Sequence, residues 1–242
     1  MGKMRLGILD AVPDEYYVSS EKTEPDKFID MFEAADAPFD YATYLATRDH
    51  FPETLDECDA YLITGSPCSV YDTYTWIERF DSFIQTAHAH KKPMVGICFG
   101  HQLIARALGG RVRLAEEGWL LGLHEFDVTV HKPWMCERRG THPLYFINQD
   151  QVIELPPGAE RLGGSPACPN AMLALDDHVL TLQAHPEQPL SSMHAFSREL
   201  LEDNGIEQSL YDAALGSMAD GDPDAALFAG WITDFIVTRS SA

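Results

Sequence analysis

The stretch that most constrains this chain is VGICFGHQ, residues 95–102, an apolar run that reaches a cysteine between two glycines and continues as a helix. This pattern is typical of a nucleophile elbow, in which a sharp strand-to-helix turn projects a side chain from the edge of a sheet. Gly96 and Gly100 relieve crowding at the turn, and the helix N-terminus favours the thiolate of Cys98. The pattern therefore predicts a nucleophilic Cys98. A cysteine buried beside packing glycines is the alternative interpretation.

The first half of the chain alternates apolar runs with amphipathic stretches. Continuous apolar runs at 4–11, 60–65 and 93–98 are typical of strands covered on both faces. Apolar residues at helical spacing predict a crossover helix over 76–90, and a second helix runs from 99 to a glycine pair at 109–110. The pattern favours an α/β fold with an open, mostly parallel sheet flanked by helices.

The second half changes character. Alternation over 124–130 predicts a half-exposed strand, and 143–156 and 178–187 contain further short strands. Three helices are expected at 192–203, 206–216 and 223–237, the last with Asp222 as N-cap and Pro223 in its first position. We expect one domain over 1–242, in which 191–242 form a helical extension that covers the sheet. A surface for a partner or for self-association is the alternative role of these helices.

Charge and cysteine content exclude several classes of function. The chain has 17 Lys and Arg against 38 Asp and Glu, a formal charge of -21, so its field repels nucleic acid and anionic membranes. No apolar run is long enough for a signal peptide or a membrane span, which predicts a soluble cytoplasmic protein. Five scattered cysteines without a CxxC pair indicate neither a disulfide scaffold nor a zinc cage, and we expect no metal or cofactor. Cys136 and Cys168 are interpreted as packing residues.

A general base for Cys98 is predicted at the end of another strand. His185 follows an apolar run in LQAHPEQ, and Glu187 faces the same side of an extended chain, so it can orient the His185 ring. A Cys98–His185–Glu187 triad results. Taken alone, HPE is a weak motif, and a surface histidine beside a glutamate is its alternative interpretation. His101, one helical turn after Cys98, is the rival base.

An oxyanion also needs donors. The backbone N–H of Phe99 supplies one by elbow geometry. The Gly65-Ser66-Pro67 turn in ITGSPCSVYD, which ends another predicted parallel strand, supplies the second candidate. An ordinary tight turn is the alternative interpretation of that loop.

Together these motifs resemble a known family. GICFGHQ, TGSP, NQDQV and QAHPE are similar in order and spacing to the class I (triad) glutamine amidotransferases, over roughly residues 4–190. The segments GSPCSVYD, ALGGRV, GWLLG and CPN resemble the stand-alone members called GMP synthase-like, which include γ-glutamyl peptidases. The chain departs from the family at Ser66, where the loop usually reads Gly-Gly-Pro, and at Asn148, where a His is common.

The resemblance implies the flavodoxin-like fold of the class I amidotransferases and hydrolysis of a γ-glutamyl amide through a cysteine thioester. It implies that Cys98 attacks the side-chain carbonyl, that the loop and the elbow hold the oxyanion, and that His185 protonates the departing amine. The substrate-binding residues that it implies are Gln102, Asn148, Gln149 and Asp150. The implied partners are a small γ-glutamyl substrate such as glutamine and, as one option, a separate synthetase subunit, because this chain has no P-loop signature. A non-catalytic interaction or regulatory module on the same scaffold is the alternative.

Overall fold

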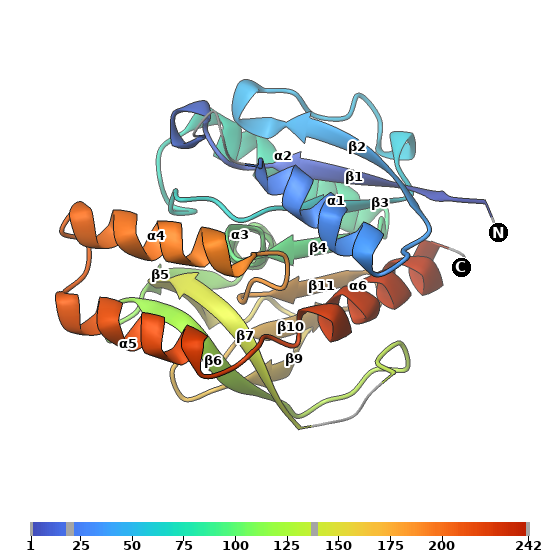
Figure 1. Ribbon diagram of the computed structural model, residues 1–242. Coiled ribbons are helices and arrows are strands. Elements are labelled where there is room, and N and C mark those ends of the chain that lie inside the picture. The colour runs from blue at the N-terminus through green and yellow to red at the C-terminus, as the bar shows by residue number, and fades with distance from the viewer. Residues whose placement is uncertain (1, 18–21, 137–139, 241–242) are drawn as a thin grey trace.

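The computed structural model describes residues 2–17, 22–136 and 140–240. Its centre is a nine-stranded sheet in the order β2-β1-β3-β4-β11-β10-β9-β6-β7 (Figure 1). The first five strands in that order pair in parallel. They are β2 (Phe39–Leu45), β1 (Met4–Asp10), β3 (Ala60–Ile63), β4 (Met94–Ile97) and β11 (Val179–Leu182). The α/β expectation is confirmed, and the strands predicted at 4–11, 60–65 and 93–98 form its middle.

The other half of the sheet is antiparallel. It contains β10 (Met172–Leu175), β9 (Ala159–Gly164), β6 (Leu120–Val128) and β7 (Thr141–Asn148), while β5 (Arg111–Leu114) and β8 (Asp150–Glu154) pair separately. The half-exposed strand predicted at 124–130 lies within β6, where Phe126 and Val128 are buried and Asp127 is exposed. It ends at Val128, two residues earlier than predicted.

Helices cover both faces of the sheet (Figure 1). On one face, α2 (Thr75–Ala89) and α3 (Phe99–Ala107) bury aromatic and aliphatic side chains against β1, β3 and β4. On the other face, α1 (Glu24–Ala34) and α6 (Ala225–Ser240) bury Phe28, Phe32, Trp231 and Phe235. Helices α4 (Leu190–Glu202) and α5 (Gln208–Ala219) cover β6 and β7. Short 3-10 turns occur at Asp14–Tyr16, Ala46–Arg48 and Leu55–Glu57.

The start of α6 corrects one expectation. Asp222 and Pro223 do not begin the helix, because the carbonyl of Asp224 accepts the first helical bond, from the N–H of Phe228. The N–H of Asp224 donates to the carbonyl of Pro143, and its carboxylate lies 2.8 Å from Nδ1 of His142. These bonds to β7 fix residue 224 outside the helix, so the helix begins at Ala225.

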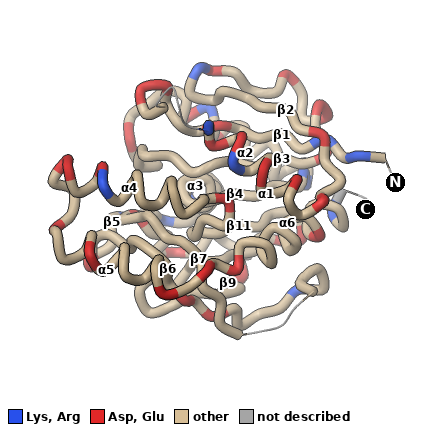
Figure 2. Tube along the Cα trace, viewed as in Figure 1, with Lys and Arg blue, Asp and Glu red and all other residues tan. Residues whose placement is uncertain are grey.

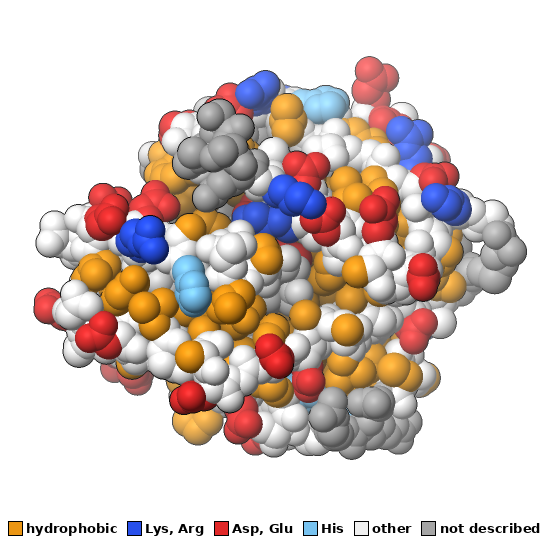
Figure 3. Space-filling view, viewed as in Figure 1, with side chains coloured by type: hydrophobic (Ala, Val, Ile, Leu, Met, Phe, Trp, Pro, Cys, Tyr) orange, Lys and Arg blue, Asp and Glu red, His pale blue; other side chains and the backbone are white. Residues whose placement is uncertain are grey.

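The surface reflects the acidic composition. Asp and Glu are spread over the whole chain and outnumber Lys and Arg (Figure 2). Hydrophobic side chains are visible over α4 and α5 (Figure 3), where Leu190 is 43% exposed. Among the described residues, no helix is both long and apolar enough to cross a bilayer.

Candidate active site

The predicted elbow is present and its backbone is strained. Cys98 lies between β4 and α3 with φ 51° and ψ -102°, a conformation that costs a residue with a side chain on the order of 1–3 kcal/mol. A Cβ on Gly96 would lie 2.5 Å from the carbonyl oxygen of Gly100, and one on Gly100 would lie 2.3 Å from that of Ile63. Only glycine therefore fits at either position.

Two backbone bonds hold the elbow to its neighbours. The N–H of Cys98 donates to the carbonyl of Leu182 at the end of β11, and the N–H of Gly100 donates to that of Thr64 after β3. The strand ends that carry the three predicted motifs are thereby fixed to one another.

His185 and Glu187 follow β11 at the same edge. Nδ1 of His185 lies 2.7 Å from Oε1 of Glu187, and both side chains are buried. A Cβ on Gly65 would lie 3.2 Å from Cε1 of His185 and 3.7 Å from Cβ of Cys98, so the imidazole and the cysteine converge on the Gly65 loop. Nδ1 donates to the carboxylate, which leaves Nε2 as the nitrogen for proton exchange.

The charges around His185 set its protonation. Burial by itself lowers the pKa of His185, but the negative charges of Glu187 and Cys98 outweigh it and raise that pKa well above its ordinary value. The protonated form of His185 is therefore favoured over that of an ordinary histidine.

These residues line one cleft of about 320 Å³ at the carboxyl edge of the parallel strands. The sequence-predicted residues that line it are Gly65, Ser66, Cys98, Phe99, Gln102, Asn148, Gln149, Asp150 and His185. Glu187 does not line the cleft and contacts it through His185.

Residues from two segments bring backbone N–H groups to the cleft. Within the described parts of the chain, the N–H groups of Gly65, Ser66 and Phe99 donate to no acceptor. Phe99 opens α3, where the first N–H groups have no partner inside the helix. The three groups are free to bind an oxyanion.

The loop after β7 is fixed by the 63–72 segment. The carboxylate of Asp150 accepts from the hydroxyl of Ser69 at 2.6 Å and from that of Tyr71 at 2.7 Å. The side-chain amide of Gln102 donates to the carbonyl of Asp150, and that of Asn148 donates to the same carbonyl. Oδ1 of Asn148 is buried without a partner among the described residues.

Sequence reasoning missed the wall formed by α1 and α4. Glu24 and Lys27 line the cleft as a buried ion pair with 2.5 Å between Oε1 and Nζ. Gln188 joins that pair to the triad, because its amide donates to Glu24 at 2.7 Å and to Glu187 at 3.2 Å. From α4, Phe196 lies with its ring 5.0 Å from Nζ of Lys27. The only local signal was the capping pattern of Thr23 and Asp26, which begins α1.

Comparison of the sequence with known proteins assigns the chain to a family. The sequence matches the family described as glutamine amidotransferase class-I over residues 37–207, more than half of the chain. The chain belongs to the class I glutamine amidotransferase family.

Its relatives within the amidotransferase family are enzymes by name. The chain is 29% identical over 194 residues to γ-glutamyl peptidase 3 of Arabidopsis thaliana, covering 77% of this chain and 78% of the relative. It is 30% identical over 142 residues to a subunit of the glutamine-hydrolysing GMP synthase of Sulfolobus acidocaldarius, covering 58% of this chain and 73% of the relative. A glutamine amidotransferase crystal structure from Thermotoga maritima has a TM-score of 0.75 over all of both chains at 18% identity, which supports the fold.

The rival base does not reach the cleft of this amidotransferase fold. His101 is fully buried, its Nδ1 lies 2.7 Å from the hydroxyl of Thr181, and burial lowers its pKa to about 3. Because α3 turns His101 toward the sheet, its spacing from Cys98 does not bring the ring to the sulfur.

The remaining cysteines differ from Cys98. Burial raises the pKa values of Cys58 and Cys168, and Cys168 packs in the core as expected. Cys68 lines the cleft, where burial also raises its pKa. The expectation for Cys136 was wrong, because its side chain is exposed in the segment that follows β6.

Proposed function

We propose that this chain hydrolyses the γ-glutamyl amide bond of glutamine or a γ-glutamyl compound, with Cys98 as the nucleophile. The observation that supports the proposal most strongly is the strained Cys98 elbow, which shares one cleft with His185 held by Glu187. A nucleophile, a base and an orienting carboxylate in that order are the elements of covalent acyl transfer.

In the first half-reaction the Cys98 thiolate attacks the γ-carbonyl carbon and forms the carbon–sulfur bond. The carbonyl electron pair moves to oxygen, where N–H groups of Phe99 and of Gly65 or Ser66 stabilise the negative charge. When the tetrahedral intermediate collapses, the carbon–nitrogen bond breaks and Nε2 of protonated His185 gives its proton to the departing amine. The raised pKa of His185 supports this role as acid.

In the second half-reaction water cleaves the thioester. Neutral His185 takes a proton from the water as its oxygen bonds to the γ-carbon, and the carbon–sulfur bond breaks. Glutamate leaves, the thiolate is restored, and His185 is protonated again. Glu187 retains its charge throughout and keeps the proton of Nδ1 on the side away from the sulfur.

We propose Gln102, Asn148, Gln149 and Asp150 as the residues that bind the amino-acid end of the substrate. Their support is their position in the cleft, beside the elbow. The two hydroxyls that bind the Asp150 carboxylate fix the loop in advance, which lowers the entropy lost when substrate binds.

The free-standing hydrolase is the favoured form of the activity. The cleft continues past Cys98 between α1 and α4, beside Lys27 and Phe196, and this space suits a leaving group larger than ammonia. The similarity to a γ-glutamyl peptidase over three quarters of both chains supports the same assignment. Similarity to part of a GMP synthase favours a second form, in which the chain passes ammonia to a separate synthetase.

The test is glutamate release from glutamine, glutathione and a panel of γ-glutamyl dipeptides, with Cys98→Ala as the inactive control. Release from peptides that depends on Cys98 supports the free-standing hydrolase. Release only from glutamine, or only after a synthetase is added, supports the amidotransferase form.

Labelling with a glutamine-like electrophile then tests the reactivity of Cys98 directly, because it does not require the natural leaving group to be known. Selective labelling of Cys98, weakened in His185→Ala, is expected. If Cys98 is labelled no faster than the exposed Cys136 and no substrate is cleaved, the scaffold is a non-catalytic module and the proposal is refuted.

A further inference from the structure

A second group of polar side chains lies outside the cleft. His88 belongs to the last turn of α2, and Asp176 and His178 lie in the turn that joins β10 to β11. Nδ1 of His88 is 2.9 Å from Nε2 of His178, and one ligand atom from each of the three residues lies within 4.8 Å of the others. The proposed reaction uses none of them.

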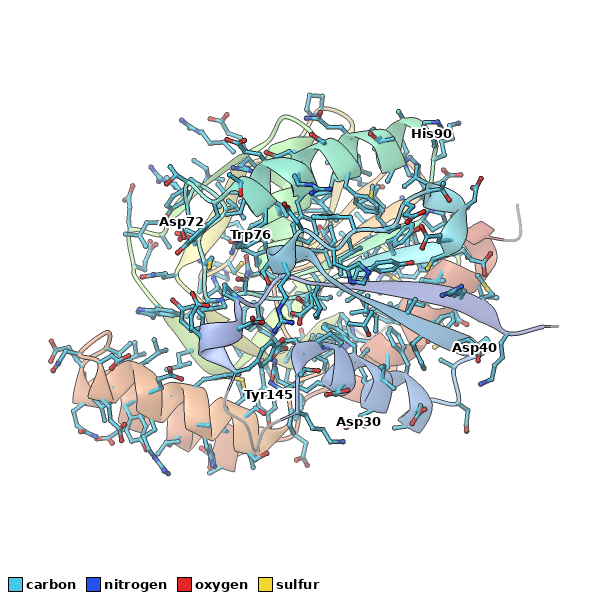
Figure 4. The ribbon with its side chains drawn as sticks, turned by 90° about the horizontal axis from the view of Figure 1, so that it is seen from above. Asp30, Asp40, Asp72, Trp76, His90 and Tyr145 are labelled. Carbon is cyan, nitrogen blue, oxygen red and sulfur yellow. The ribbon has the colours of Figure 1, made fainter. Side chains whose placement is uncertain are left out.

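The group lies at the other end of the parallel strands from Cys98. The carbonyl of His178 accepts from the N–H of Met94, so the group adjoins the first residues of β4 and β11. Cys98 and His185 follow the last residues of the same two strands. In Figure 4, Trp76 marks the end of α2 near the elbow, where it packs against Phe99, and His90 marks the other end.

We propose that His88, His178 and Asp176 form a binding site for a divalent metal ion of the zinc class. Two imidazole nitrogens and one carboxylate are a common ligand set for Zn²⁺, with water in the fourth position. The side chain of His178 is buried, that of His88 is half-buried, and that of Asp176 is exposed, so the ion can enter from the Asp176 side. No sequence motif indicated this site, because its ligands come from segments that lie far apart in the chain.

The surroundings of His178 favour the tautomer that a metal needs. Its Nδ1 is buried, donates to no acceptor among the described residues, and lies 3.7 Å from a carboxylate oxygen of Asp177. A proton on Nδ1 faces that carboxylate and leaves the Nε2 lone pair directed at His88. A carboxylate behind a metal-bound histidine is a recurrent outer-shell arrangement.

Metal binding requires a proton shift on His88 and an inward movement of the exposed Asp176 carboxylate, whose ligand atom lies within 4.8 Å of the two nitrogens. In the metal-free pair, Nδ1–H of His88 donates to Nε2 of His178. Binding moves the His88 proton from Nδ1 to Nε2, so that ring stays neutral and both facing lone pairs bind the ion. Bond lengths of about 2.0–2.1 Å in tetrahedral geometry separate two nitrogens by about 3.3 Å, so the pair opens by a few tenths of an ångström.

The site would join α2 to the β10–β11 turn. A ligand that binds the native state but not the unfolded chain raises the melting temperature. The expected role is structural, with no effect of metal on the chemistry at Cys98.

The experiment titrates Zn²⁺ into the chelator-treated full chain after alkylation of its thiols, and follows heat and melting temperature. We expect one ion per chain, a melting temperature raised by several degrees, and affinity at least tenfold weaker in His88→Gln and Asp176→Asn. The matched control is His90→Gln, an exposed histidine just past the end of α2 whose Nδ1 lies 2.8 Å from the carbonyl oxygen of Thr86.

Melting curves without metal show whether each variant folds, and because His88 is half-buried its variant should do so. Co²⁺ should give the visible bands of nitrogen and oxygen ligands in the wild type, reduced in His88→Gln. Equal Zn²⁺ affinity in His88→Gln and His90→Gln, or no binding by the wild type at micromolar Zn²⁺, overturns the proposal and leaves a histidine pair joined by a hydrogen bond.

Discussion

Replacing Glu187 by glutamine tests the proposed triad most directly. The substitution keeps the shape of the side chain but removes the charge 2.7 Å from Nδ1 of His185. His101 shows what burial does to a histidine without such a partner, because burial is the only influence on its pKa and lowers it to about 3. In Glu187→Gln we therefore expect the pKa of His185 to fall, because the substitution removes the negative charge that does most to raise that pKa against the effect of burial.

The size of the effect follows from the proton that His185 supplies. Each unit by which its pKa falls changes the balance of its two protonation states by about 1.4 kcal/mol, or tenfold. Loss of a positioned acid and base lowers kcat by about 10²- to 10⁴-fold. Because His185 acts as the acid when protonated, activity falls as pH rises through its pKa, and this limb should move to lower pH in the variant.

The assay is glutamate release against pH, with rapid-quench measurement of the thioester. Glu117→Gln, an exposed site, is the matched control and should retain wild-type rates. Melting temperatures separate lost chemistry from lost folding. If folded Glu187→Gln keeps kcat within threefold and its high-pH limb does not move, Glu187 does not govern His185 and the triad is refuted.

Three further predictions concern stability, each measured as unfolding free energy by denaturant or heat. Gly100→Ala should lower the unfolding free energy by more than about 2 kcal/mol, because the added Cβ would lie 2.3 Å from a backbone oxygen. Gly230→Ala, where the added Cβ meets open space in α6, should raise it by about 0.5–1 kcal/mol. Equal effects of the two substitutions would contradict this description of the packing. Burial raises the pKa of Asp10 from 3.8 to about 6, so its ionisation lowers stability as pH rises through that window. Asp10→Asn should then gain on the order of 3 kcal/mol at pH 7.5 and almost nothing at pH 3.5, and a gain independent of pH would refute this. Lys27→Met should lower the unfolding free energy by about 3–5 kcal/mol, because it leaves the buried Glu24 carboxylate without its cation. Adding Glu24→Gln should restore most of that loss. No difference between the single and the double variant would refute a buried ion pair.

The sequence predicted the parts of the cleft that follow strand ends. The motifs at 63–67, 95–102, 148–150 and 185–187 each come after an apolar run. Because the carboxyl ends of parallel strands meet at one edge, separate local patterns were enough to bring the 63–67, 95–102 and 185–187 motifs together. The 148–150 loop reaches the same cleft from an antiparallel strand, β7, and its position there was implied by the family resemblance alone.

The parts that sequence missed depend on packing between distant segments. No sequence pattern predicts that Glu24 and Lys27 are buried, because their burial results from the docking of α1 beside His185. The start of α6 depended on a bond from Asp224 to β7, where local capping preference favoured Asp222. His101 satisfied the spacing for a base, but α3 directs it into the sheet.

The strain at Cys98 links the fold to the proposed chemistry. A residue with a side chain stays at φ 51° only when its surroundings leave it no other conformation. Here close contacts leave room only for glycine at positions 96 and 100, and the bonds from Cys98 to β11 and from Gly100 to the β3 loop hold both sides of the turn. Those bonds also attach the elbow to the segments that carry His185 and Gly65. The sulfur, the imidazole and the proposed oxyanion donors therefore keep their relative positions because the same contacts maintain the strain.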